Sequence, residues 1–124
     1  MIAINKPLKQ MEAELKREIT RIHKDIIGKG PGSTSIKIFE NVIFFKLQDI
    51  FSPFEISLLE IPDGEKRLKQ IRMELFESYG HELIEMFTNH VDCSLEDVLS
   101  NIDEKKGIAY ILLILDKDVE SCFD

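Results

Sequence analysis

The sequence has few of the features that mark secreted or membrane-spanning proteins. Its 124 residues include only two cysteines, Cys93 and Cys122, too few for a disulfide framework, so we expect reduced thiols in the cytosol. The longest apolar run, at residues 108–115, is far shorter than the roughly 20 residues of a membrane-spanning helix. The first ten residues lack the apolar core of a signal peptide. These absences predict one soluble cytoplasmic domain over residues 1–124, without a membrane span.

Positive charge is also scarce. The chain holds 16 lysines and arginines against 23 aspartates and glutamates, a net charge of −7, whereas general nucleic-acid binding needs a basic surface. We therefore expect no nucleic-acid partner. Basic residues prevail in residues 1–30 and acidic residues in 74–124. The simpler interpretation is that the basic N-terminal helix lies near the acidic C-terminal half, and the alternative is a basic arm for an anionic partner.

The chain also lacks the patterns typical of enzymes and metal sites. It has no GxSxG motif, and neither cysteine has a recognisable base partner. His90 and Cys93 are spaced like half of a zinc site, but no second pair stands at ligand spacing. Carboxylates are frequent in residues 74–85, where a hydrolase is one interpretation and a solvated helix face the simpler one. We predict a non-catalytic protein with no cofactor, no metal and no catalytic residue.

The stretch GKGPGSTS at residues 28–35 has the composition of a phosphate-binding loop. Such a loop needs GxxxxGK[ST] between a strand and a helix, so that the helix N-terminus faces the phosphate. Here the lysine comes early, a helix precedes and a strand follows, which places the loop at the negative end of a helix. We interpret the stretch as a structural connector. The alternative is an anion or partner contact through Lys29.

Apolar spacing predicts the first half of the fold. Residues 8–27 form an amphipathic helix that Gly28 ends, and a hairpin follows with Glu40 and Asn41 as its two-residue turn. One face of this hairpin is core. The other carries three apolar side chains between two lysines, which indicates a contact surface; its members are Phe39, Val42 and Phe44, with Lys37 and Lys46 at the rim.

The second half is predicted to contain two helices and two strands. Ser52 caps a short helix over 53–61, and a long helix covers 63–90, with Gly80 as a bend unless the helix overhangs into a partner. Strands are predicted over 95–102 and 107–116, although the apolar spacing of the first of these also fits a helix. The fold class is therefore α+β, in the order α-β-β-α-α-β-β, with a four-stranded, mostly antiparallel sheet and the helices largely on one face.

Four basic residues gather at the start of the long helix. Lys66, Arg67, Lys69 and Arg72 lie within two turns and can bind an acidic partner segment or a phosphorylated ligand. Pairing with acidic residues of the same helix is the simpler interpretation.

The order of these features resembles the MpsC-like family of small bacterial proteins, over about residues 8–116. The resemblance rests most on Gly28-Lys29-Gly30-Pro31, on the Ser52–Leu59 segment, where the family has a Thr-x-x-Glu-like helix start, and on Arg72. The longer segments that carry it are IKIFENVIFFKLQDIFSPFEISLLE, DGEKRLKQIRMELFESYGHELIEMF and VLSNIDEKKGIAYILLIL. The tail after residue 116 has no counterpart in the resemblance.

The resemblance implies an accessory protein, encoded in some bacteria with membrane subunits that move sodium or inorganic carbon. The leading hypothesis is a cytoplasmic interaction protein, peripheral to the inner face of the membrane, whose partners are a second copy and transporter subunits. The alternative is a regulatory module that binds a small anionic ligand. The residues expected to contact a partner or an anion are Lys29, Phe39, Val42, Phe44, Lys66, Arg67 and Arg72.

Overall fold

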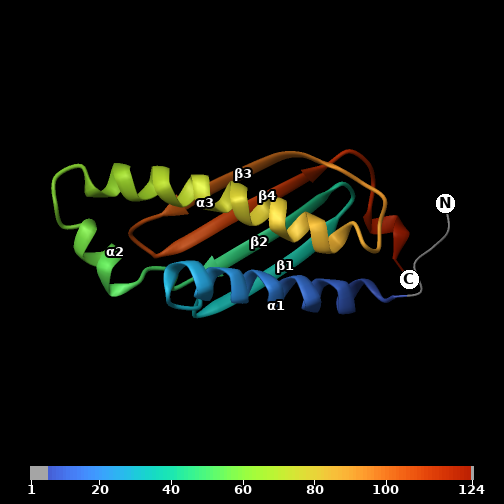
Figure 1. The fold of residues 1–124 in the computed structure, drawn as a ribbon, viewed down its shortest axis with the longest axis horizontal. Coiled ribbons are helices and arrows are strands. Elements are labelled where there is room, and N and C mark those ends of the chain that lie inside the picture. The colour runs from blue at the N-terminus through green and yellow to red at the C-terminus, as the bar shows by residue number, and fades with distance from the viewer. Residues whose placement is uncertain (1–5, 124) are drawn as a thin grey trace.

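The computed structural model describes residues 6–123, and its elements follow the predicted α-β-β-α-α-β-β order (Figure 1). The four strands pair antiparallel in the order β1-β2-β4-β3, which confirms the α+β prediction. The elements are α1 (Leu8–Ile27), β1 (Ser33–Phe39), β2 (Val42–Gln48), α2 (Pro53–Leu58), α3 (Gly64–Phe87), β3 (Leu95–Asp103), β4 (Ile108–Leu115) and the 3-10 helix η1 (Glu120–Cys122).

Helix α1 has the predicted bounds, and of its predicted apolar stripe the middle is buried (Met11, Leu15, Ile19 and Ile22), whereas Ile26 is exposed. Gly28 ends the helix in the left-handed region, with φ of 89°, and its N–H donates to the Lys24 carbonyl. A residue with a side chain adopts this conformation at a cost, which is why glycine suits the position. Arg21 of α1 pairs with Glu82 of α3 at 3.2 Å, so the basic first helix does lie beside an acidic helix.

The first hairpin has the predicted turn and register. Phe39 pairs with Val42 and Ile36 with Phe45, with Glu40 and Asn41 between the strands. Strand β1 is an edge of the sheet. Part of this edge is covered, because the Glu12 carboxylate of α1 accepts the Ile38 N–H at 2.7 Å.

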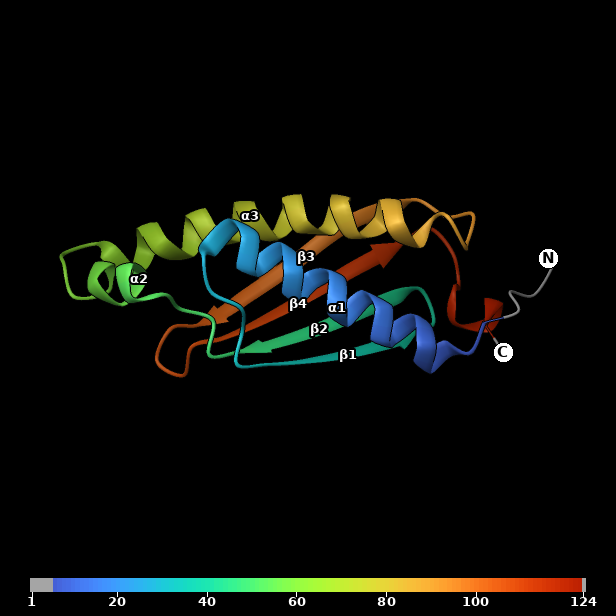
Figure 2. The ribbon, with the colours of Figure 1, turned by 60° about the horizontal axis from the view of Figure 1, so that its bottom comes forward.

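Helices α1 and α3 lie on the same face of the sheet (Figure 2). Each central strand alternates between a buried side chain under the helices and a less buried one on the other face. The core is formed where the helices meet the sheet; its largest apolar members are Tyr79, Phe45, Phe76, Phe87, Met11, Leu15, Ile19, Ile22, Ile38, Ile43 and Leu47.

Helix α3 runs unbroken through Gly80, so the predicted bend is absent and the predicted overhang is present. A Cβ at Gly80 would lie 2.9 Å from a methyl of Val98 and 3.0 Å from one of Leu113. Glycine is therefore present because the helix backbone approaches the sheet closely, not because the helix bends. The N-terminal part of α3 and the short helix α2 project beyond the end of the sheet (Figure 1).

The strand predicted over residues 95–102 is confirmed as β3, Leu95–Asp103. The segment after β4 folds back onto the end of the core. Val119 and Cys122 are buried there, and the Phe123 ring lies 5.8 Å from that of Phe87. This segment also contacts the turn of the first hairpin, because the Val119 N–H donates to the Glu40 carbonyl at 2.9 Å.

Candidate functional site

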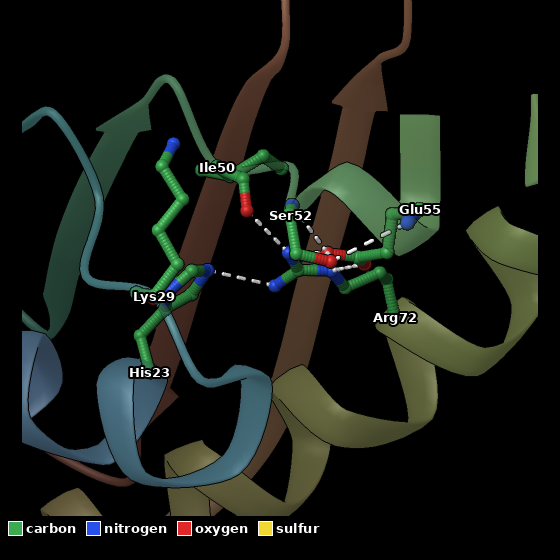
Figure 3. Close-up of polar contacts among 6 residues, drawn as sticks. All are labelled: His23, Lys29, Ile50, Ser52, Glu55 and Arg72. Carbon is green, nitrogen blue, oxygen red and sulfur yellow. Dashed lines mark hydrogen bonds and ion pairs between the residues drawn. The ribbon is translucent and has the colours of Figure 1, made fainter. Parts of the chain in front are cut away.

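Arg72 is fully buried where α3 leaves the sheet (Figure 3). Its guanidinium forms a bidentate ion pair with Glu55 of α2, with Nε to Oε2 at 2.6 Å and Nη2 to Oε1 at 2.9 Å. Nη2 also donates to the Ile50 carbonyl at 2.5 Å. The rings of Phe51 and Phe76 each lie 5.9 Å from the guanidinium carbon, within the range of cation–π contacts.

His23 of α1 completes this buried centre. Its Nδ1 lies 2.6 Å from the Lys29 carbonyl, which only accepts hydrogen bonds, so Nδ1 carries the proton. Nε2 is then an acceptor for Arg72 Nη1 at 2.8 Å. Burial and the neighbouring Arg72 charge lower the pKa of His23 to about 4, so the ring is neutral at pH 7.

Glu55 is positioned by the start of its own helix. The Ser52 hydroxyl accepts the Glu55 N–H, and Glu55 Oε1 accepts the Ser52 N–H at 3.0 Å, which forms a capping box. Burial alone would raise the pKa of Glu55, but hydrogen bonds from Arg72 and Ser52 hold it below its usual value. The carboxylate is therefore ionised, as the ion pair requires.

This centre joins four separate parts of the chain. The three pieces on which the family resemblance rests most meet in it, since it contains the Lys29 carbonyl, the Ser52–Glu55 capping box and Arg72. Sequence reasoning missed His23 and Glu55 as partners of Arg72. The available signal was that the three most specific pieces of the family resemblance lie far apart in the sequence, which is typical of residues that meet at one site.

Arg72 does not lie with the other basic residues of α3. It faces the interior, while Lys66 and Arg67 are exposed. Lys69 pairs with Glu104 at 2.7 Å and Glu65 at 3.4 Å. Lys66 lines a groove of about 580 Å³ between α3 and β3 whose apolar wall includes Met73. The basic surface of the start of α3 therefore consists of Lys66 and Arg67, beside a groove.

Lys29 lies at the surface near the buried centre but is held by Asp49. Its Nζ donates to the Asp49 carbonyl at 2.7 Å and lies 2.9 Å from Oδ1 of the same residue. The loop from residue 28 to residue 32 follows the C-terminal end of α1, as the connector interpretation requires.

The sheet face away from the helices carries Phe39, Val42 and Phe44, and we call it the open face. Phe39 is 56% exposed and Leu99 of β3 is 49% exposed. The Phe44 and Tyr110 rings stack across neighbouring strands, with centroids 6.4 Å apart. By strand register the open face comprises Phe39, Lys37, Ser35 and Ser33 on β1, Val42, Phe44, Lys46 and Gln48 on β2, Ile114, Leu112, Tyr110 and Ile108 on β4, and Asp97, Leu99, Asn101 and Asp103 on β3.

A second apolar surface lies at the projecting end of the molecule, and we call it the α2 end. It consists of Phe54, Ile56 and Ile61, of which Phe54 is 73% exposed and Ile56 51% exposed. Beside it, a hollow of about 560 Å³ separates α2 from the turn between β3 and β4, with Ile56 in its wall. No composition signal separates these side chains from core residues, so sequence reasoning did not find this surface.

Within residues 6–123 no cluster of three or more His, Cys, Asp or Glu side chains is arranged to hold a metal ion. In the same part of the chain, no helix combines the length and apolar character needed to cross a membrane.

Comparison with known proteins gives one family. The family model described as "Na+-translocating membrane potential-generating system (MpsC)" matches residues 8–117. The chain is 26% identical over 110 residues to the uncharacterised protein YbcI of Bacillus subtilis (strain 168), and the match covers 89% of each chain. No solved structure matches the chain.

Proposed function

The chain belongs to the MpsC family, and from this premise we propose that it is a non-catalytic, cytoplasmic accessory protein of a membrane system that moves sodium or bicarbonate. The family description links the chain to a Na+-translocating, membrane-potential-generating system. In this proposal the protein sits at the inner face of the membrane and binds the membrane-embedded subunits.

The observation that carries this proposal is the α2 end. Phe54, Ile56 and Ile61 are exposed together on a part of the molecule that projects beyond the sheet (Figure 1). Burying a side chain of this size against a partner contributes about 1.5–3 kcal/mol. Exposed large apolar side chains concentrated at one end of a molecule favour a protein-binding role for that end.

The projection is also tied to the rest of the fold by buried contacts. Arg72 ties α3 to α2 through Glu55 at the point where α3 leaves the sheet. Its bond to His23 ties the same point to α1. The α2 end is therefore presented in one orientation, which reduces the entropy lost on binding.

The test is affinity purification of the tagged protein from its native cells after crosslinking, with membrane and soluble fractions analysed separately. We expect recovery of a polytopic ion-transport subunit with the wild-type chain and loss of that subunit with Phe54→Ser/Ile56→Ser. Ile26→Ser, at an apolar position on α1 that is 47% exposed, close to the 51% of Ile56, is the control. If the transport subunit is absent, or is recovered equally with the double variant, the proposal is wrong.

We further propose that the protein is a homodimer. The open face has an apolar centre that the described part of the chain leaves uncovered (Figure 2). A second copy is the simplest occupant of such a face, since it brings an identical apolar centre. Light scattering of the purified protein at micromolar concentration tests this state directly, and a monomeric mass contradicts it.

A regulatory module that binds a small anionic ligand is the second candidate. It is favoured by Lys66 and Arg67, which are exposed near the groove between α3 and β3 and make no ion pair among the described residues. Bound ligand raises the melting temperature. In a thermal-shift screen of nucleotides and carboxylates, we expect Lys66→Ala/Arg67→Ala to abolish any rise, and a rise that persists assigns the ligand elsewhere.

A further inference from the structure

The open face has an ordered charge pattern. Strand register aligns it in four rows across the sheet, and in each row the residue from β1 stands at one edge and the residue from β3 at the other. The cations, Lys37 and Lys46, lie on the β1 and β2 side. The anions, Asp97 and Asp103, lie on β3 at the opposite edge. The face is therefore basic at one edge, apolar in the middle and acidic at the other edge.

The lysines of this face have no internal partner. Within residues 6–123, neither Lys37 nor Lys46 forms an ion pair, whereas Lys29, Lys69 and Arg72 do. Asp97 accepts only the N–H of its neighbour Val98 among the described residues. Asp103, by contrast, accepts the Lys105 and Lys106 N–H groups. Lys37, Lys46 and Asp97 are therefore the charges of this face that can pair with another molecule.

We propose that the open face binds the open face of a second copy, with the two-fold axis parallel to the strands. This inference rests on the homodimer proposed above and specifies its geometry. Such an axis exchanges the two edges of the sheet, so that β1 of one copy lies over β3 of the other. The basic edge then meets the acidic edge twice, and the apolar centre meets itself.

The alternative two-fold axis is excluded by the same charges. An axis in the interface but perpendicular to the strands places β1 over β1 and β3 over β3. Lys37 then lies over the strand that carries the other Lys37, and Asp97 lies over Asp103 of the other copy, because this axis reverses the order of the rows. Like charges across an interface suppress association, so the charge pattern selects one of the two face-to-face arrangements.

The distances fit paired sheets. In the proposed dimer, Lys37 of one copy and Asp97 of the other belong to neighbouring rows, so their positions differ by about 7 Å along the strand direction. The length of a lysine side chain spans this displacement. Sheets that pack face to face lie about 10 Å apart with strands roughly 30° from aligned. The stacked pair of Phe44 and Tyr110 lies near the middle of the face, where aromatic residues stabilise interfaces most.

The area of the face is sufficient for a specific but modest dimer. Four strands at about 4.8 Å spacing, each about seven residues long, give a surface of roughly 19 by 23 Å. Covering it on both copies removes on the order of 1,000 Å² from water, at the lower limit for a specific interface. Self-association in the micromolar range is expected.

A charge exchange tests this geometry. We expect Lys37→Asp and Asp97→Lys each to halve the mass measured by light scattering at a concentration where the wild type is dimeric. Each variant alone places like charges against each other at both edges. An equimolar mixture of the two variants restores both oppositely charged contacts, so the mixture is expected to regain the dimeric mass, as is the double variant.

Control variants carry the same charge changes away from the open face. Lys16→Asp on α1 and Glu85→Lys on α3 are both exposed, and we expect each to remain dimeric. Far-ultraviolet circular dichroism verifies that every variant is folded. Leu112→Lys, which places a charge at the apolar centre, is expected to give a monomer.

A monomeric wild type overturns this inference, as does a dimer that both single reversals leave intact or a mixture that stays monomeric. Each of these failures is independent of the accessory role, which the recovery of a transport subunit from cells decides. Conversely, a charge exchange that restores the dimer supports the inference even when no transport subunit is recovered.

Discussion

Phe44 and Phe45 are neighbours on β2, yet they belong to opposite faces of one sheet. Phe45 is completely buried under the helices, while Phe44 lies on the open face beside Tyr110. The alternation of side chains along a strand places Val42 and Phe44 on the open face and Ile43 and Phe45 under the helices, so this part of the central strand is apolar on both faces. What differs is the cover: one face receives two helices and a buried ion-pair centre, and the other receives no element of the described chain (Figure 2).

This comparison shows that apolar composition alone does not decide which face of a sheet is covered by the chain's own helices. On the helix-covered side, polar contacts join the helices to one another. Arg72 of α3, for example, bonds to Glu55 of α2 and to His23 of α1. On the open face, Lys37 and Lys46 form no ion pair within the described chain. Changes to the covered face should therefore alter folding, and changes to the open face should alter association.

The largest expected effect comes from removing the arginine that holds the covered face to α2. We expect Arg72→Ala to lower the free energy of unfolding by about 3–5 kcal/mol, with the result near the upper end of that range. The reason is that the variant leaves the Glu55 carboxylate buried without a counter-charge. Urea denaturation gives the measurement. Arg72→Lys keeps the charge but loses the bidentate geometry and should be intermediate, whereas Arg67→Ala, exposed on the same helix, should leave stability unchanged. Equal effects of Arg72→Ala and Arg67→Ala would contradict the role given to the buried centre.

The next effect compares the two faces directly. We expect Phe45→Ala to lower the free energy of unfolding by about 3–4 kcal/mol, because it leaves a cavity beneath the helices. Phe44→Ala should cost much less in a dilute sample and should weaken self-association instead. Denaturation and light scattering of both variants measure the two effects. The comparison between the faces would be wrong if Phe44→Ala destabilised the monomer as strongly as Phe45→Ala.

The covered face should also lose stability in acid through His23. The pKa of His23 is about 4 in the folded protein and 6.5 in a free side chain, so the unfolded chain takes up the proton first. Stability is full above pH 6.5 and falls by about 3 kcal/mol as the pH drops toward 4, since each pKa unit corresponds to about 1.4 kcal/mol.

His23→Gln separates this effect from other titrations. The variant has no imidazole to protonate, so its stability should fall less steeply between pH 6.5 and 4.5 than that of the wild type. The lowered pKa of Glu55 contributes only below its usual value of 4.5. Melting temperatures measured across this range decide the matter, and parallel curves for the two proteins would exclude His23 as the cause.

The smallest of these effects concerns the close contact between α3 and the sheet. Gly80→Val should lower the free energy of unfolding by about 1–3 kcal/mol, because the new methyl groups meet Val98 and Leu113. Ser78→Val, on the same helix and exposed, is the control for the helix propensity of valine. A Gly80→Val variant as stable as that control would show that the helix can move away from the sheet.

The elements that could be predicted from sequence are those governed by neighbouring residues. The bounds of α1, the register around Glu40 and Asn41 and the cap at Ser52 follow from spacing, turn chemistry and capping, which act over a few residues. Strand β3 was ambiguous by spacing alone, since Leu95, Val98 and Leu99 fit a helix, and its pairing with β4 decides the outcome.

The burial of Arg72 could not be predicted in this way. Its partners come from segments 17, 22 and 49 residues away, and nothing local shows that these segments meet. In the sequence Arg72 shares a short stretch with Lys66 and Arg67, which suggested one basic surface. The helical position of Arg72 turns it inward instead. The continuity of α3 at Gly80 likewise depends on contact with strands that follow later in the chain.

The hydrogen bond between the Glu12 carboxylate and the Ile38 amide has a consequence for exchange with solvent and for aggregation. An edge strand normally offers its outward amides to water or to a strand of another molecule. Here that amide is already bound, so Ile38 should exchange its hydrogen slowly for an edge position. A strand of another molecule that added to β1 at Ile38 would have to displace the Glu12 carboxylate, which disfavours fibril-like growth of the sheet at this position.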